Sequence, residues 1–258
     1  MSAGIIAMTD NAIRIVGFIP ARIQSVRFPR KPLGTICGKP MIMWVVDRAS
    51  LSPLLDEVYV ATDSLEILRS VRDHGGKALL TSETHSSGTD RVAEAARSVG
   101  LADQDIAVNI QGDQPLFDPV MVEEVVRPLM DDALIPMSTL VYRIVREEEV
   151  HHPNAVKTVI DTEGFALYFS RATIPFFREE PSAGVYYKHH GIYAYRNDFL
   201  QRFASLPPSP LETAERLEQL RALEHGYRIK TVLTDKDSIE VDTPEDLDRV
   251  CRTVSEGA

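Results

Sequence analysis

Short apolar runs recur along the first half of the chain, and segments with helical spacing follow them. Strands of the buried type are predicted at 15–19, 57–63, 77–81 and 106–110. Helices are predicted at 41–49, at 65–74 and at 121–130. A further helix is predicted to follow the loop 84–91 and to end at Val99. Because this alternation favours right-handed crossovers, we expect a mostly parallel sheet with its ligand beyond the carboxyl ends of the strands. Pro20 is expected to end the first strand, and Thr62 or Asp63 to cap the second helix.

The second half of the chain contains a predicted antiparallel hairpin. Two β-type runs, at 155–160 and 165–169, meet at a turn in which Gly164 takes the left-handed conformation. We therefore expect one domain, 1–258, with an antiparallel insert at about 150–196 that covers a site, makes a dimer contact or has no partner. Further strands are predicted at 134–142 and 228–233, and further helices at 198–205, 211–226 and from Thr243 onward.

The composition is that of an ordinary globular protein, with 44% hydrophobic and 26% charged residues in a chain of 258. No apolar run approaches the roughly 18 residues of a spanning helix, and the N-terminus resembles neither a signal peptide nor an anchor. Cys37 and Cys251 lie so far apart in the sequence that nothing suggests a pair, and a reducing cytoplasm is expected. The net charge of −10 argues against a general nucleic-acid binder, but it allows a single nucleotide in a local basic pocket.

One stretch departs from this acidic background. Between 11 and 46 there is no Asp or Glu, and the basic residues there are Arg14, Arg22, Arg27, Arg30, Lys31 and Lys39. The loop between the first strand and the first helix lies within it. In α/β proteins such a loop holds phosphates, since its N–H groups and the helix start face the anion. A solvated charged loop is the alternative. Because neither GxxxxGK[ST] nor GxGxxG occurs, we predict a nucleotide held at its triphosphate.

Two carboxylates are candidates for a metal site. Asp113 directly follows the strand at 106–110, in the segment QGDQP, and Asp242 precedes the predicted helix cap Thr243. Mg²⁺ prefers one or two carboxylates together with phosphate oxygens, so a carboxylate beside a triphosphate loop suits it. The alternative is that both aspartates only turn the chain or cap helices.

Other polar segments are ambiguous by themselves. The loop 84–91 offers caps for the helix that follows it. The adjacent histidines in KHHGIY diverge on a strand and so do not form a metal site, and we interpret His189 and Tyr193 as hydrogen-bond donors to a polyhydroxylated acid. Glu218, in LEQLR, is by itself typical of a solvent-facing helix residue.

Five motifs follow one another along the chain: IPAR-x4-R-x-P-x-KPL-x4-GKPMI, SGTDR, QGDQP, H-x-GIY and VDTPEDL. In this order, over 15–250, they resemble the CMP-KDO synthetase (3-deoxy-manno-octulosonate cytidylyltransferase) family. The resemblance implies a Rossmann-like α/β nucleotidyltransferase fold, with a small antiparallel lobe that covers the site and takes part in a homodimer. It also implies Mg²⁺-dependent coupling of CTP to 3-deoxy-D-manno-octulosonate (KDO), giving CMP-KDO and pyrophosphate for lipopolysaccharide synthesis in the cytoplasm.

The resemblance also implies the roles of individual residues. Asp113 and Asp242 would hold Mg²⁺ and, with Arg22 and Lys31, form the catalytic set. CTP would be bound by Ala21, Arg22, Arg27, Lys31, Ser87, Gly88, Thr89, Gln111 and Asp113. The sugar acid would be bound by Arg91, Gln111, Pro115, His189, Tyr193, Glu218 and Gln219.

The chain departs from the family pattern at three positions. Arg30 stands where the family usually has Gly, Gln114 replaces the Glu of QGDEP, and His190 occupies a position that is usually apolar. If the backbone at Arg30 needs φ > 0, Arg costs about 1 kcal/mol there. Gln114, with SIEVDTPED and KHHGIYAYR, favours the branch that uses 8-amino-KDO as an alternative. A nucleotide-sugar binding protein without turnover is the second alternative.

Overall fold

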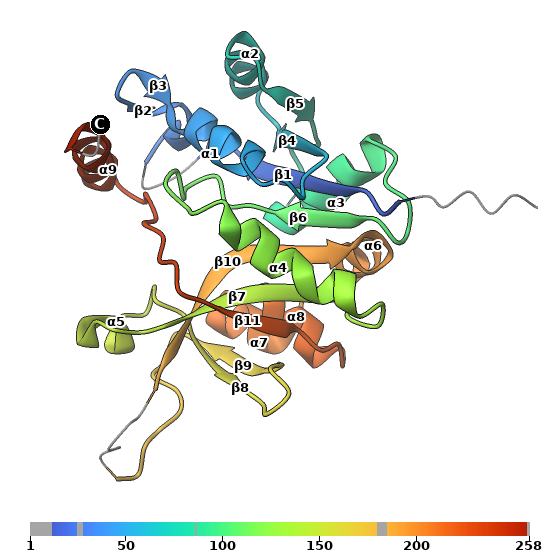
Figure 1. The fold of residues 1–258 in the computed structure, drawn as a ribbon, viewed down its shortest axis with the longest axis vertical. Helices are drawn as coiled ribbons and strands as arrows, with labels where there is room; N and C mark the ends of the chain where they lie inside the picture. The colour runs from blue at the N-terminus through green and yellow to red at the C-terminus, as the bar shows by residue number, and fades with distance from the viewer. Residues whose placement is uncertain (1–11, 25–27, 86, 180–184, 257–258) are drawn as a thin grey trace, which may run out of the picture.

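The computed structural model describes residues 12–24, 28–85, 87–179 and 185–256. One mixed sheet of nine strands runs through these residues in the order β11-β7-β10-β6-β1-β4-β5, with β8 beside β10 and β9 beside β8 (Figure 1). The strands are β1 (Ile15–Ala21), β4 (Glu57–Thr62), β5 (Lys77–Leu80), β6 (Ile106–Asn109), β7 (Met137–Arg143), β8 (Lys157–Ile160), β9 (Ala166–Ser170), β10 (Tyr187–Arg196) and β11 (Lys230–Thr234).

Most neighbouring strands of the central sheet are parallel. β1 pairs parallel with β4 and β6, β4 with β5, and β7 with β11. β10 runs antiparallel between β6 and β7, so these two strands point in the same direction. The predicted α/β fold with a mostly parallel central sheet is therefore confirmed, and the carboxyl ends of β1 and β6 lie side by side.

Helices cover both faces of the sheet. They are α1 (Met41–Ser50), α2 (Leu65–Asp73), α3 (Gly88–Ser98), α4 (Val120–Asp131), α5 (Glu147–His151), α6 (Asn197–Ser205), α7 (Pro210–Glu215), α8 (Gln219–Glu224) and α9 (Pro244–Glu256), with a 3-10 turn η1 (Lys31–Leu33). α1, α2 and α4 pack with Ile15 and Ile19 on one face, and α3, α6 and α8 pack with Val16 and Phe18 on the other. Each such apolar side chain contributes roughly 1.5–3 kcal/mol when it is buried.

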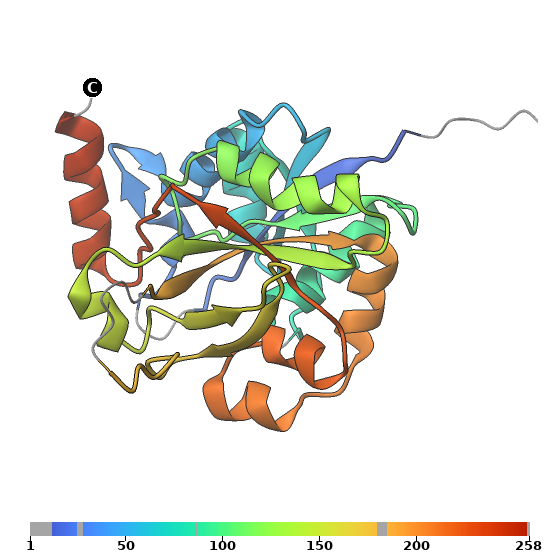
Figure 2. The same ribbon diagram turned by 60° about the horizontal axis from the view of Figure 1, so that its bottom comes forward.

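A separate small sheet, which was not predicted, lies at the edge of the molecule. It consists of β2 (Thr35–Ile36) and β3 (Lys39–Pro40), and α9 lies beside it (Figure 2). Ile36 and Val250 are buried together between them. Cys37 and Cys251, which were expected not to pair, lie here with their sulfur atoms 3.2 Å apart. Both cysteines are free thiols, and they come close because α9 returns to the N-terminal hairpin, which distance along the sequence does not reveal.

The predicted hairpin is present, since β8 and β9 pair antiparallel and Gly164 has φ 80°. Within the expected insert at 150–196, β10 is a central strand of the main sheet, whereas β8 and β9 lie beside it. Among the helices of the described residues, none is long and apolar enough to cross a bilayer.

Two predictions about the early elements were wrong. β1 does not end at Pro20 but continues to Ala21, because Ala21 pairs with Thr62 of the neighbouring strand. The cap of α2 is Ser64 rather than Thr62 or Asp63, and its hydroxyl accepts a backbone N–H of the first turn.

The helix predicted at 211–226 is interrupted. Arg216 takes a left-handed conformation, with φ 52°, between α7 and α8. The buried guanidinium of Arg221 bonds to both oxygens of Glu212, at 2.8 and 2.6 Å, and joins the two short helices. Leu217 and Leu220, which follow the break, are both buried.

Candidate active site

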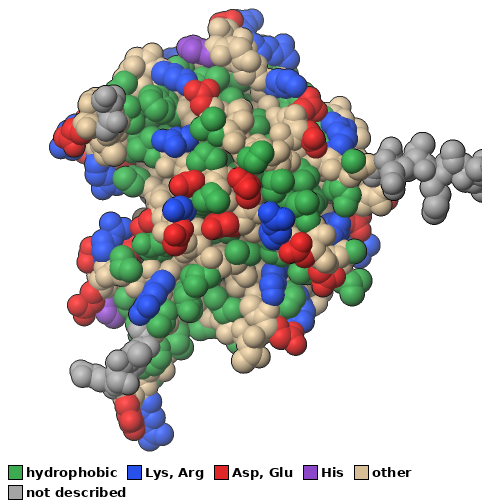
Figure 3. Space-filling view, in the orientation of Figure 1, with side chains coloured by type: hydrophobic (Ala, Val, Ile, Leu, Met, Phe, Trp, Pro, Cys, Tyr) green, Lys and Arg blue, Asp and Glu red, His purple; other side chains and the backbone are tan. Residues whose placement is uncertain are grey.

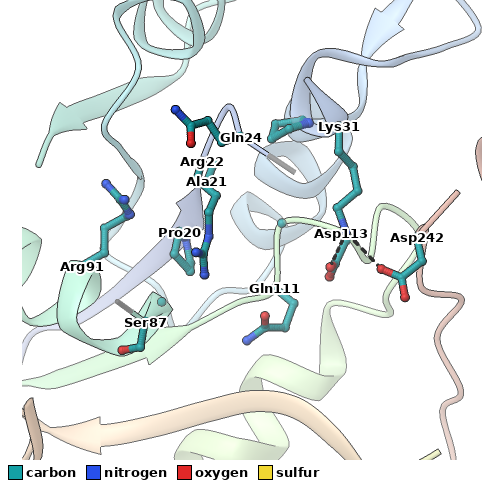
Figure 4. A pocket seen from close by; sticks show the side chains of 13 residues that line it. Pro20, Ala21, Arg22, Gln24, Lys31, Ser87, Arg91, Gln111, Asp113 and Asp242 are labelled. Atoms are coloured by element: carbon teal, nitrogen blue, oxygen red, sulfur yellow. Dashed lines mark hydrogen bonds and ion pairs between the residues drawn. The ribbon is translucent and has the colours of Figure 1, made fainter. Parts of the chain in front are cut away.

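A cavity of about 480 Å³ lies beyond the carboxyl ends of β1 and β6, where ligands of parallel sheets are expected (Figure 4). Its walls come from the loop after β1, the start of α3, the loop after β6 and the segment before α9. The lining residues are Pro20, Ala21, Arg22, Gln24, Lys31, Pro32, Ser87, Gly88, Arg91, Gln111, Gly112, Asp113 and Asp242. Most of the predicted nucleotide-binding residues are therefore brought together, whereas Arg27 lies outside the described residues.

Lys31 joins the two predicted metal-binding carboxylates. Its ammonium nitrogen is 2.8 Å from Asp113 Oδ2 and 3.3 Å from Asp242 Oδ1, and it also donates to the carbonyl of Val241 at 3.0 Å (Figure 4). Burial lowers the pKa of Lys31, but the two carboxylates outweigh it and raise that pKa above its ordinary value. The two carboxylates thus converge on one position that already holds a positive charge.

Local backbone features place these three side chains. Arg30 has φ 59°, and η1 begins directly after it at Lys31. This confirms that the position where the family usually has Gly is left-handed. The Val241 N–H donates to the Asp113 carbonyl at 2.9 Å, so the segment before α9 is fastened to the loop after β6. Asp242 is held by its N–H, which donates to Asp246 Oδ2 at 3.1 Å.

The loop after β6 approaches the loop after β1 closely. A Cβ atom at Gly112 would lie 3.2 Å from the backbone carbonyl oxygen of Pro20. A side chain at Gly112 would therefore press the two loops apart by a few tenths of an ångström, so Gly suits the position beside Asp113.

The motif SGTDR forms the start of α3. Ser87 caps this helix by accepting the Asp90 N–H at 3.1 Å, so the expectation that it supplies a cap is confirmed. Thr89 does not line the cavity; its hydroxyl donates to Glu218 Oε2 at 2.7 Å. Burial raises the pKa of Glu218, while hydrogen bonds from Ser87 and Thr89 oppose that rise. Glu218 is therefore a half-buried side chain held by Thr89 and not a fully solvent-facing one.

Arg91 lies at the side of the cavity opposite Lys31 (Figure 4). Its buried guanidinium donates to Asp63 Oδ2 at 2.6 Å and to the hydroxyl of Thr81. Sequence reasoning missed this partner because Asp63 was assigned to a helix cap. The available signal was that Asp63 also follows a parallel strand and so lies at the same edge of the sheet.

The remaining predicted sugar-binding residues lie outside the cavity lining. His189 Nε2 is 2.9 Å from Thr139 Oγ1, and the ring packs edge-on against Phe169 with centroids 5.1 Å apart. Burial, together with the neighbouring His190, lowers the pKa of His189 to about 3, so the ring is neutral at pH 7. Tyr193 is buried beside it, with ring centroids 5.2 Å apart. Pro115 and Gln219 are buried as well.

Gln111 connects the cavity to this second group. It lines the cavity, and its side-chain amide donates to the carbonyl of Gly191 at 2.7 Å. Gly191 lies between His190 and Tyr193, where the pairing of β10 with β7 shifts register. A ligand bound over Gln111 would therefore lie next to the part of β10 that carries His189 and Tyr193.

A second cavity, of about 730 Å³, adjoins the first and shares Asp242 with it. It lies between α5 and the start of α9, where Figure 3 shows a hollow in the surface. Lys188 is buried at its wall and pairs with Glu149 at 2.7 Å and with Asp237 at 2.9 Å. This cluster was not predicted. The sequence features that could have indicated it are a lysine within a strand and the acidic run in α5.

The Gln114 departure has a structural counterpart. Gln114 is buried, and its amide donates to Glu240 Oε1 at 3.2 Å. Partial desolvation in the cleft, with the negative charges of Asp113 and Asp242 nearby, raises the pKa of Glu240 above its ordinary value, although part of this residue is exposed at the surface. A carboxyl group is thus present beside Asp113 even though residue 114 is an amide.

Residues 16–231 match the family model described as cytidylyltransferase. The chain belongs to the cytidylyltransferase family. This cytidylyltransferase is 57% identical over 237 residues to the 3-deoxy-manno-octulosonate cytidylyltransferase of Syntrophus aciditrophicus, covering 92% of this chain and 96% of that protein. The family that the motifs resembled is thereby confirmed, and so is the prediction of a nucleotidyltransferase.

Two further comparisons bear on the ligands of the cytidylyltransferase. It is 51% identical over 234 residues to the 8-amino-3,8-dideoxy-manno-octulosonate cytidylyltransferase of Shewanella piezotolerans, covering 90% of this chain and 95% of that protein. It is 43% identical to the solved structure of CMP:2-keto-3-deoxy-manno-octonic acid synthetase complexed with CTP. That likeness has a TM-score of 0.89 and covers 95% of this chain and 100% of the other.

Proposed function

We propose that this cytidylyltransferase couples CTP to KDO, releasing pyrophosphate and forming CMP-KDO for lipopolysaccharide synthesis. The observation that carries the proposal is the convergence of Lys31, Asp113 and Asp242 beside Arg22 in a cavity at the strand ends. This arrangement suits a triphosphate, because cations face its oxygens and carboxylates can share a metal ion with it. The relative that is 57% identical carries the name of this activity.

Mg²⁺ fits the donor set of this site. Asp113 and Asp242 both point at the same cationic position, as shown by their contacts with Lys31. Among the described residues, no group of three or more His, Cys, Asp or Glu side chains is placed to hold a metal. Two protein carboxylates with phosphate oxygens and water are the usual environment of Mg²⁺, and in this site the ion would neutralise the phosphates.

The residues of the chain would position the reactants and neutralise charge. The anomeric hydroxyl of the sugar acid attacks the α-phosphorus in line, and pyrophosphate leaves. Two like charges about 4 Å apart repel by roughly 4 kcal/mol at an effective dielectric constant near 20, so cations are needed where both anions meet. Arg22, Arg27 and Lys31 would hold the leaving pyrophosphate. Ser87 and Gly88, with Ala21, would contact the nucleoside, and Thr89 would support them through its bond to Glu218.

The sugar acid would lie over Gln111, toward β10. Gln111 bonds to Gly191, and His189 and Tyr193 flank that point of the strand. Glu218 reaches the same side through Thr89, with Gln219 beside it, and Arg91 and Pro115 would complete the pocket. Because His189 is neutral at pH 7, it would act as a hydrogen-bond partner and not as a cation.

Incubation with CTP and Mg²⁺ tests this proposal, with KDO and 8-amino-KDO added separately and then in competition. CMP-KDO and equimolar pyrophosphate are expected with KDO. Exclusive use of the amino sugar would support the alternative suggested by the Shewanella piezotolerans relative. CTP binding without pyrophosphate release in either case would favour a non-catalytic nucleotide-sugar binding protein.

We also propose that the enzyme works as a homodimer in the cytoplasm. Large apolar side chains are exposed around the β8–β9 hairpin, at Leu167 of β9 and at Phe176, which are 62% and 87% exposed. A self-association surface would cover such groups. Light scattering after size exclusion should give twice the monomer mass, and Phe176→Asp should shift the enzyme toward monomer. A monomer at micromolar concentration would contradict the proposal.

A further inference from the structure

Two cysteines meet where the C-terminal helix packs on the N-terminal hairpin. Cys37 and Cys251 are 214 positions apart in the sequence, yet their sulfur atoms are 3.2 Å apart. Cys37 is exposed and Cys251 is half-buried, so small molecules can reach the pair. Both thiols are therefore placed to react with one another and with a solute.

The backbone at Cys37 is unusual for cysteine. Cys37 and Gly38 form the two-residue connection between β2 and β3, with φ 48° and 81°. Hairpin turns with two positive φ values favour Asn or Gly, because a Cβ atom is strained there. A cysteine in this position is unexpected for the turn, and the turn directs its side chain onto α9.

Packing holds the two elements together around the thiols. Val250 of α9 is fully buried with Ile36 of β2, and Leu247 and Val254 extend this apolar contact along the helix. The Trp44 indole N–H donates to the Ile36 carbonyl at 3.1 Å and ties the hairpin to α1. The short sulfur–sulfur distance therefore belongs to a packed interface.

The surroundings of Cys37 favour its reactive form. Its sulfur lies 3.5 Å from the Ser255 hydroxyl, and hydrogen bonds from Ser255 and Cys251 lower the pKa of the Cys37 thiol. The thiolate is the nucleophile in thiol–disulfide exchange, so Cys37 is the attacking residue of the pair.

We propose that Cys37 and Cys251 form a reversible disulfide that fastens α9 to the β2–β3 hairpin. A low-molecular-weight disulfide such as oxidised glutathione is the oxidant. The Cys37 thiolate attacks one of its sulfurs and expels one thiolate, which leaves a mixed disulfide. The Cys251 thiolate then attacks the Cys37 sulfur and expels the second thiolate. Two protein thiols are oxidised, and one glutathione disulfide is reduced to two glutathione molecules.

The bond would act on the segment that carries Asp242. This residue directly precedes Thr243 and the first turn of α9, so movement of the helix away from the hairpin also displaces Asp242. A disulfide suppresses such local openings because it reduces the conformational entropy of the state in which the helix has detached. The oxidised protein should therefore keep α9 docked under conditions that loosen it in the reduced protein.

The test equilibrates the full chain with oxidised and reduced glutathione. The reaction is then quenched with acid, free thiols are alkylated, and the mass of the protein is measured by mass spectrometry. With oxidised glutathione in excess, the expected product is a monomeric chain with no alkylatable thiol, lighter by about 2 Da and without bound glutathione. Cys37→Ser and Cys251→Ser should each retain glutathione instead, because the second exchange step is removed. Two alkylatable thiols, or glutathione retained on both cysteines of the wild-type protein, would overturn the proposal.

Limited trypsin digestion gives an independent readout, because Arg249 and Arg252 lie in α9. Cleavage there should slow at least about fivefold on oxidation and recover with dithiothreitol, since cleavage requires local opening. The rate for Cys37→Ser should not respond to oxidant. Equal cleavage rates for the oxidised and reduced wild-type protein would show that no bond holds the helix. None of these measurements depends on CTP or a sugar, so they can fail or succeed independently of the proposed reaction.

Discussion

Replacement of Lys31 by Met tests the cluster at the centre of the site. In the wild-type protein the Lys31 ammonium lies within 3.3 Å of the Asp113 and Asp242 carboxylates and separates their charges. Methionine keeps most of the apolar stem but removes the charge and the hydrogen bond to the Val241 carbonyl. The two carboxylates would then face each other without compensation.

The expected cost follows from the geometry. At a separation of about 6 Å and an effective dielectric constant near 20, two unit charges repel by about 3 kcal/mol. Movement of the side chains and water entry will relieve part of this, so we expect a loss of about 2 kcal/mol in the free energy of unfolding. Lys77→Met is a matched control, because Lys77 pairs with Glu57 at 2.7 Å but its side chain is 56% exposed. That substitution should cost much less stability than Lys31→Met, because the ion pair is exposed to solvent.

Urea unfolding with and without Mg²⁺ and calorimetric titration with CTP measure these effects. Mg²⁺ should stabilise Lys31→Met more than the wild-type protein, because the ion replaces the missing ammonium; at ten times its Kd it adds about 1.4 kcal/mol. CTP should bind at least about tenfold more weakly, since a charge-assisted contact with phosphate is lost. The reasoning would be refuted if Lys31→Met had the stability and the CTP affinity of the wild-type protein and the same response to Mg²⁺.

Three further substitutions probe other parts of the site. Asp113→Asn should lower kcat at least about 100-fold while the protein still unfolds in one cooperative thermal transition, and near-normal turnover would exclude the metal role. Arg30→Gly should raise stability by about 0.5–1 kcal/mol in urea unfolding, because φ is 59° there and only an exposed pair with Glu66 is lost; a loss of stability would contradict this. His190, which faces Lys188, Asp237 and Glu149, has its pKa lowered to about 4, chiefly by burial. The neutral His190 therefore stabilises the folded protein above the unfolded-state pKa near 6.5, and this contribution to the free energy of unfolding should fall by about 2 kcal/mol between pH 7 and pH 5. If the free energy of unfolding of His190→Asn fell as much as that of the wild-type protein over this range, the prediction would be wrong.

Elements with a strong local signal could be predicted from the sequence. β1, β4, β5 and β6 are short apolar runs that end near polar residues, so their alternation with helices predicted the parallel sheet and the edge that carries the site. Lys31 and Asp113 were predicted together because both follow strands whose carboxyl ends meet at that edge. The location of the cavity therefore follows from local patterns and one rule of α/β topology.

Contacts between distant segments could not be predicted in this way. The contact of Cys37 with Cys251 depends on how the β2–β3 turn and α9 pack, for which the sequence has no periodic signal. The break at Arg216 is another example, because an Arg221–Glu212 bridge between the two short helices stabilises the bend. In each case a tertiary contact outweighed the local preference.

Pyrophosphate release from CTP and Mg²⁺ is the measurement that tests the proposed reaction most directly, with KDO, 8-amino-KDO or no sugar added. Asp113→Asn should serve as the inactive control, since its fold is expected to be intact. We predict release equimolar with the KDO consumed and no release without sugar. Absence of release with both sugars, from a protein that still binds CTP, would contradict the assignment of this site to cytidylyl transfer onto an octulosonic acid.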